Sequence, residues 1–149
     1  MELSDEIVVP GKRDDVFALL INPEVLKHCI PGCEELELKG ANEYTAKVVL
    51  KIGPVKAKFS GSVTLDTTEA PGKLTLAGSG DGGLAGFAKG GADVEMVDQG
   101  ETTLLKYTAK AETGGKIAQL GARLITSTAR KLAKMFFESF EKYASGGNV

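Results

Sequence analysis

The residues with the most reactive side chains lie close together in one short segment. His28, Cys29 and Cys33 fall within six positions, and a soft metal ion can use imidazole and thiolate ligands of this kind. The chain has no other cysteine or histidine, so a fourth ligand of these types and a second cluster are missing. We therefore expect these residues to pack at the end of a helix, and the sequence predicts no metal site.

Acid, base and nucleophile pairs are equally hard to find. His28 and Cys29 are adjacent, and adjacent residues of a helix point about 100° apart, which disfavours a catalytic pair. The acids near the predicted turns and strands alternate with apolar residues, as on a solvated face; they are Asp93, Glu95, Glu101 and Glu112. The sequence therefore predicts no catalytic residue, and a binding protein rather than an enzyme.

A glycine-rich segment could bind phosphate or act as a flap. Residues 78–83 match the pattern G-x-G-x-x-G, but no parallel strand and helix surround them, so a dinucleotide site is disfavoured. The whole segment 78–91 predicts a mobile flap that carries Leu84, Phe87 and Lys89 and could close over a pocket or touch a lipid surface. A wide bulge without function is the alternative.

The elements that must position these residues follow from hydrophobic periodicity. Period-two alternation predicts strands over 3–9, through 36–38, over 44–52 and 55–65, from 74 into the glycines, and over 92–96 and 103–111. Helical spacing predicts short helices over 13–21 and 23–29 and a long helix over 116–143. This order predicts an α+β helix-grip fold, in which a curved antiparallel sheet of six to seven strands wraps around the C-terminal helix.

Size, composition and charge restrict the function further. The 149 residues suit a single domain, expected over 1–144, with a loose C-terminal tail over 145–149. A net charge of -2 disfavours nucleic acid as a partner. Acids near the start of the chain, instead of the lysines of a secretory signal, predict a cytoplasmic protein. We expect no cofactor, and no apolar stretch approaches the roughly 20 residues that span a bilayer.

Small residues on the predicted inner faces favour a ligand pocket. Small residues of the strands would face small residues of the long helix: Ala46, Ala57, Gly61, Ala92, Ala109 and Ala111 on the strands, and Gly121, Ser127, Thr128 and Ala129 on the helix. A dry, empty pocket of roughly 300 to 1,000 Å³ would cost on the order of 7 kcal/mol or more, so such a space is expected to be open to water or occupied by an apolar ligand, and a ligand is the more economical interpretation. Close approach of helix and sheet, with no cavity, is the alternative. The predicted lining is Val48, Leu50, Phe59, Phe87, Met96, Leu105, Tyr107, Leu120, Leu124 and Thr128, with Ser127, Thr128 and Tyr107 as polar anchors.

Four segments carry a resemblance to a known family: Ile30–Glu34, Lys51–Gly61, Gly86–Gly90 and Gly114–Gly121. Together they resemble the CoxG-like family of carbon monoxide dehydrogenase subunits, within the SRPBCC superfamily of START-like, Bet v 1-like domains. The resemblance covers residues 1 to 144. It implies a hydrophobic ligand such as a lipid or a quinone, and an accessory role beside a molybdenum-containing carbon monoxide dehydrogenase or related hydroxylase. Peripheral contact with the inner face of the membrane is a further expectation.

The sequence is compatible with three functions. The first is a binding module for a small apolar molecule. The second is a factor that docks on a molybdenum hydroxylase or its maturation machinery, with an incidental pocket. The third is a cyclase or hydrolase, for which only Tyr107 and His28 are inward candidates for an acid or base.

Overall fold

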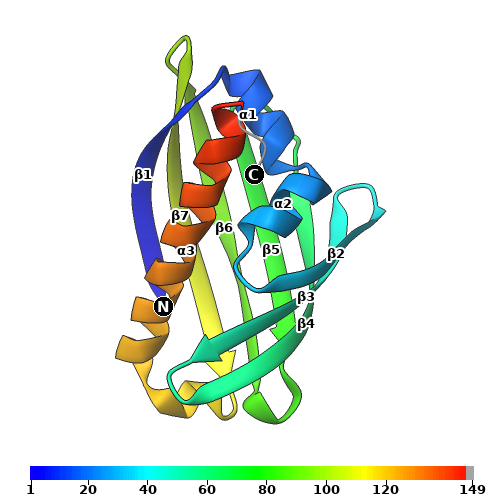
Figure 1. Ribbon diagram of the computed structural model, residues 1–149, viewed down its shortest axis with the longest axis vertical. Helices are drawn as coiled ribbons and strands as arrows, with labels where there is room; N and C mark the ends of the chain where they lie inside the picture. The colour runs from blue at the N-terminus through cyan, green and yellow to red at the C-terminus, as the bar shows by residue number, and fades with distance from the viewer. Residues whose placement is uncertain (147–149) are drawn as a thin grey trace.

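The computed structural model describes residues 1–146, which form a seven-stranded sheet, three α-helices and two short 3-10 helices (Figure 1). In chain order the elements are β1 (Glu2–Pro10), α1 (Arg13–Leu20), α2 (Pro23–Cys29), β2 (Cys33–Gly40), β3 (Glu43–Ile52), β4 (Val55–Asp66), β5 (Lys73–Asp81), η1 (Gly83–Ala85), β6 (Phe87–Asp98), β7 (Thr102–Gly114), η2 (Ile117–Leu120) and α3 (Ala122–Ala144).

The sheet is antiparallel throughout, with the strand order β1-β7-β6-β5-β4-β3-β2. Consecutive strands from β2 to β7 are neighbours, and β1 adds to the far side of β7. Figure 1 shows the sheet curving around α3, with α1 and α2 beside the C-terminal end of that helix. The predicted helix-grip fold, including the two short helices after the first strand, is therefore confirmed.

The glycine-rich segment is not a separate flap, and that prediction was wrong. It forms the ends of β5 and β6, in which Gly78 pairs with Gly90 and Gly80 with Ala88, and only η1 interrupts them. A Cβ on Gly90 would lie 2.1 Å from the carbonyl oxygen of Lys110 in β7. A strongly curved sheet brings neighbouring backbones this close, so the glycines serve the bend of the sheet.

The first residues of α2 and α3 are determined by a side-chain cap, a proline and a glycine. The Asn22 side chain accepts a hydrogen bond from the Glu24 amide at 2.9 Å, and Pro23 occupies the first turn of α2. The long helix begins at Ala122, six residues later than predicted, because Gly121 has φ 97° and ψ 152°. This conformation is open to glycine and ends η2 before α3 starts.

Two separate hydrophobic clusters stabilise the fold. The larger joins both short helices and the C-terminal half of α3 to the sheet, and includes Val9, Val16, Met96, Leu105 and Phe140. The smaller gathers the three turns at the other end, through Ile52, Ala57, Phe59, Ala85 and Ile117. The core is therefore divided along the length of α3.

The end of the chain was predicted to be loose from residue 145. Ser145 and Gly146 form a turn that closes α3, with the Ser145 hydroxyl donating to the Lys142 carbonyl at 2.8 Å. Residues 147–149 lie outside the described part of the chain. Within residues 1–146, no helix combines the length and the apolar character needed to cross a membrane.

Candidate functional site

A belt of small residues lies on the inner face of the sheet between the two clusters. Ala46 pairs with Gly61, Gly61 with Gly80, and Gly80 with Ala88, so one row across four strands has no side chain larger than a methyl group. The next rows contain Gly78 beside Gly90 and Ala111, and Ala92 beside Ala109. Strand alternation places these residues on the same face as the buried Tyr44 and Val94. The predicted inner positions are confirmed.

The side chains along the inner side of α3 are mostly only half-buried. Its apolar stripe runs through Leu124, Thr128, Leu132 and Phe136 to Phe140, and only Phe140 is fully buried. The backbone of α3 comes closest to β1 and β3, on the two sides of the curved sheet, and bridges the strands between them. Leu132 and Val48 are half-buried and belong to neither hydrophobic cluster. We use the word chamber for the region between the two clusters that is bounded by the belt, Val48, Thr128 and Leu132; the two hollows described below lie elsewhere, on the outer face of the sheet.

The structure divides the predicted lining residues into four groups. Met96 and Leu105 are buried in the larger cluster, with Tyr107 packed against it. Phe59 is buried in the smaller cluster, where three half-buried residues, Leu50, Leu120 and Leu124, pack on it. Val48 and Thr128 lie between the two clusters. These nine residues therefore lie on the inner face of the sheet, in η2 or on α3, and their role in ligand binding stays a prediction, whereas the tenth, Phe87, lies elsewhere.

Phe87 lies on the outer face of the sheet. Its side chain is 45% exposed, and its ring covers Gly114 of β7, where a Cβ would approach within 2.2 Å of the ring. Because β6 starts at Phe87, strand alternation turns Ala88, Gly90 and Ala92 inward and Phe87 outward. The prediction that Phe87 closes over the pocket is therefore wrong.

Two half-buried polar side chains lie on the inner side of the fold, Tyr107 on β7 and Thr128 on α3. The ring of Tyr107 stacks on Phe137 with centroids 5.1 Å apart, and burial, together with the Asp5 carboxylate, raises the pKa of Tyr107. The phenol therefore stays neutral over the physiological range and can donate a hydrogen bond. Thr128 supplies a hydroxyl from α3, whereas Ser127, the third predicted anchor, is exposed and donates to the Leu124 carbonyl at 3.1 Å.

The segment that contains His28, Cys29 and Cys33 has a structural role in the packing of α2. The Nδ1–H of His28 donates to the Glu24 carbonyl at 2.8 Å, and its ring lies 6.3 Å from that of Tyr143. Cys29 is 1% exposed, and burial raises the pKa of its thiol to about 11. Residues 1–146 contain no group of three or more histidine, cysteine or acidic side chains that could hold a metal ion.

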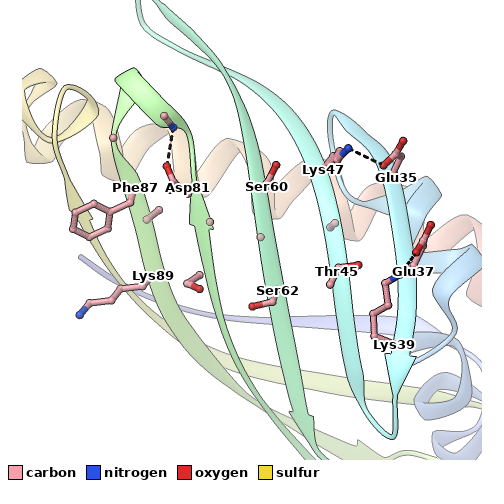
Figure 2. Close-up of a pocket in the computed structure, with 17 residues that line it drawn as sticks. Glu35, Glu37, Lys39, Thr45, Lys47, Ser60, Ser62, Asp81, Phe87 and Lys89 are labelled. Carbon is pink, nitrogen blue, oxygen red and sulfur yellow. Dashed lines mark hydrogen bonds and ion pairs between the residues drawn. The ribbon is translucent and has the colours of Figure 1, made fainter.

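A second hollow, which the sequence reasoning missed, lies on the outer face of the sheet. Figure 2 shows this groove, of about 820 Å³, crossing strands β2 to β6. Its floor consists of hydroxyl side chains, with Thr45, Ser62 and Ser79 side by side in register. A further hollow of about 590 Å³ adjoins it and shares Ser62, Ser79 and Lys89.

The rims of this outer groove are charged. On β2 and β3, Lys47 pairs with Glu35 at 3.5 Å, and Lys39 with Glu37 at 2.5 Å. On the opposite rim, Lys89 lies 3.5 Å from Glu112. The only signal in the sequence was the run of small hydroxyl residues at alternate positions of β4, Ser60, Ser62 and Thr64, which also suits an ordinary solvated face.

Solved structures of the same architecture cover almost the whole chain. A conserved protein from Geobacillus kaustophilus is 31% identical, with a TM-score of 0.91 over 98% of this chain and 96% of that one. A START superfamily protein from Mycobacterium smegmatis is 12% identical, with a TM-score of 0.75 over 97% of each chain. The Zhui aromatase/cyclase from Streptomyces sp. R1128 is 12% identical, with a TM-score of 0.71 over 99% of each chain.

The last two likenesses show the fold alone, which is the START-like and Bet v 1-like helix-grip fold. No curated protein matches the chain in sequence. The model of the carbon monoxide dehydrogenase subunit family CoxG matches residues 6–145, nearly all of the chain. The protein therefore belongs to the CoxG family of carbon monoxide dehydrogenase subunits.

Proposed function

We propose that this protein holds a small apolar molecule, such as a lipid or a quinone, in the chamber between the sheet and α3. In this role it serves a carbon monoxide dehydrogenase-type molybdenum hydroxylase as an accessory protein, in the cytoplasm. The family of the chain supports the second part of the proposal. The division of the hydrophobic core into two clusters supports the first part, the binding of an apolar molecule.

One observation carries the proposal: the belt of glycine and alanine separates two hydrophobic clusters under a helix whose central residues are only half-buried. Protein cores are normally packed at crystal-like density, and a cavity costs roughly 24 cal/mol for each Å³ that stays empty. An apolar ligand in the chamber would restore the missing contacts. The neutral Tyr107 hydroxyl and Thr128 would hold a single polar group of that ligand.

Native mass spectrometry of the protein purified from its own host tests this proposal. We expect a stoichiometric mass increment that disappears on denaturing extraction, and the extract should contain a lipid or quinone. A clean apo mass, together with no uptake of added hydrophobic molecules, would contradict the chamber as a binding site.

The outer groove supports a second candidate function, docking on a protein partner. It is polar, its rims carry both signs of charge, and Phe87 offers one exposed aromatic side chain at its end. Protein interfaces commonly combine an aromatic anchor with a polar rim of this kind. The partner that the family suggests is the dehydrogenase itself.

Co-purification with a molybdenum hydroxylase distinguishes the two functions. Docking through the groove predicts that Phe87→Ala and Ser62→Arg lose the partner while Thr128→Phe, in the chamber, retains it. Retention of the partner by both groove variants would exclude this surface.

Catalysis is the least supported function. Zhui aromatase/cyclase shares the fold, and so does a norcoclaurine synthase from Thalictrum flavum at 17% identity and a TM-score of 0.65. In the present chain, however, of the two predicted acid or base candidates only Tyr107 packs on the inner side of the sheet, and His28 is exposed. A neutral phenol alone offers no acid–base pair at neutral pH.

A further inference from the structure

Strand β1 forms a free edge of the sheet, on the side where the backbone of α3 comes close to it (Figure 1). Its residues alternate between the two faces, and those on the inner face are Leu3, Asp5, Ile7 and Val9. Leu3 and Val9 are buried and Ile7 is half-buried, as residues of the inner face should be, but Asp5 is exposed. A carboxylate therefore lies on the face of β1 that otherwise packs.

Charged residues are rare on the inner face of the described strands. The inward positions of β3 to β7 carry apolar, glycine or hydroxyl-bearing residues, except for Asp98 at the end of β6. Asp98 accepts a hydrogen bond from the Gly100 amide at 2.9 Å and so stabilises the β6–β7 turn. Asp5 lies in the middle of its strand, where there is no turn to stabilise.

The carboxylate of Asp5 has little to bind within the chain. It accepts a hydrogen bond from the amide of the next residue, Glu6, at 2.8 Å. It forms no ion pair with any residue in the range 1–146. Most of its capacity to accept hydrogen bonds therefore remains available to a molecule from outside the chain.

Tyr107 is the cross-strand neighbour of Asp5. Directly opposite residues have Cβ atoms roughly 4.5 to 5.5 Å apart, and burial together with the Asp5 carboxylate raises the pKa of Tyr107. The hydroxyl of Tyr44, another inward tyrosine, donates to the Ile21 carbonyl, whereas the Tyr107 hydroxyl has no such partner in the described part of the chain. A free donor and a free acceptor thus lie side by side.

This pair adjoins the belt of small residues. Leu3 pairs with Ala109, which pairs in turn with Ala92. Ala109 is therefore the diagonal neighbour of Asp5, with a Cβ separation of roughly 7 to 8 Å. A ligand in the chamber that extends a polar group toward β1 would bring that group to Asp5 and Tyr107.

Protection of the sheet edge is the alternative role for Asp5. A charge that points inward on an edge strand discourages pairing with another sheet. The strand has other protection, however, because Glu2 and Glu6 are exposed on its opposite face and Pro10 ends it. Edge protection also gives no reason for a tyrosine with a free hydroxyl beside the carboxylate. The two roles differ in the effect that Asp5 has on a bound molecule.

We infer that Asp5 and Tyr107 select the ligand of the chamber by its polar group, favouring an alcohol or an amine over an acid. This inference rests on the proposed binding of an apolar molecule in the chamber. A carboxylate accepts a hydrogen bond from a hydroxyl or ammonium group, and a phenol donates one to a hydroxyl or carbonyl oxygen. An acid would meet the like charge of Asp5, so a fatty acid binds through its chain but less tightly than the alcohol or amine of equal length.

Displacement of the neutral fluorescent dye N-phenyl-1-naphthylamine tests the selection. The competing ligands share one alkyl chain and are dodecanol, dodecylamine and dodecanoic acid, each below its micelle concentration. We expect the alcohol and the amine to displace the dye at concentrations about tenfold lower than the acid does. Asp5→Asn should reduce the preference of amine over acid about tenfold, because the charge is lost and the size is kept. Tyr107→Phe should weaken the alcohol about threefold or more and leave that preference in place.

Matched variants locate the effect. Glu6→Gln makes the same change of charge at the next residue of β1, on the outer face, and should leave the preference as it is. Thr128→Phe should lose the dye itself, and circular dichroism verifies that each variant folds. Equal affinity for amine and acid, or equal shifts in Asp5→Asn and Glu6→Gln, would overturn the selection while the chamber remains a binding site. Absence of any binding by the unmodified protein would instead contradict the proposed function, and this inference with it.

Discussion

Single buried polar groups attach the helices to the sheet. The Tyr44 hydroxyl donates to the Ile21 carbonyl between α1 and α2 at 2.5 Å, and the Thr103 hydroxyl donates to the Gly11 carbonyl at 2.9 Å. Thr103 is fully buried, so its hydroxyl could not exchange this partner for water. Both contacts fix the short helices α1 and α2 against the sheet, on the larger hydrophobic cluster.

The thiol of Cys29 makes the free energy of unfolding dependent on pH. Burial raises its pKa from 9.0 to about 11, so the unfolded chain loses the proton at a lower pH than the folded chain does. The free energy of unfolding should therefore be unaffected below pH 9.0 and fall as pH rises toward 11. The contribution of one thiol is at most about 1.4 kcal/mol per pH unit.

Urea unfolding of Cys29→Ala and of the unmodified protein across this range measures the effect. The variant should lose a large part of the alkaline decline, although its free energy of unfolding at neutral pH is lower because a buried group is removed. Cys33→Ala serves as the comparison: burial also raises the pKa of this half-buried thiol, but Lys27 and a hydrogen bond to the Glu35 backbone oppose the shift, so a smaller effect is expected. An identical alkaline decline in Cys29→Ala and in the unmodified protein would show that this thiol is not responsible.

At the scale of elements, most strands could be predicted, because apolar and polar residues alternate along them. The start of α3 could not be predicted in the same way. Apolar residues keep a helical spacing across η2 and Gly121, namely Ile117, Leu120 and Leu124. The hydrophobic periodicity therefore continues through a segment in which the backbone is not α-helical. The flap prediction was wrong for a related reason: a glycine-rich composition predicts mobility, whereas in this sheet glycine allows neighbouring strands to approach closely.

The junction between η2 and α3 gives a prediction about Gly121. A Cβ there would meet no atom within 4 Å, yet the φ of 97° strains any other residue. Gly121→Ala should therefore lower the free energy of unfolding by about 1 to 3 kcal/mol through backbone strain alone. Thermal or chemical unfolding measures the loss.

Gly40→Ala is the control for this change. Gly40 has no positive φ, and its added Cβ would make an ordinary contact of 3.7 Å with Glu43. Its free energy of unfolding should change little or rise. If Gly121→Ala were as stable as Gly40→Ala, the assigned conformation of the junction would be wrong.

At the scale of the whole molecule, the inner positions could be predicted but the shape of the surface could not. Strand alternation identified Ala46, Gly61, Ala92 and Ala109 as inward, because a period of two needs only the sequence. The outer groove arises from the curvature of the sheet, which brings the distant residues Glu37, Ser79 and Lys89 to one hollow.

The central claim is that the chamber accommodates an apolar ligand, and Thr128→Phe tests it most directly. Thr128 faces the chamber from α3, whereas its neighbour Ser127 is exposed and provides the matched control Ser127→Phe. The measurement is saturable uptake of a fluorescent fatty acid, with circular dichroism to verify folding. We predict uptake by the unmodified protein and by Ser127→Phe, and a loss of about tenfold or more in folded Thr128→Phe. Equal uptake by the two variants, or none by the unmodified protein, would contradict the account.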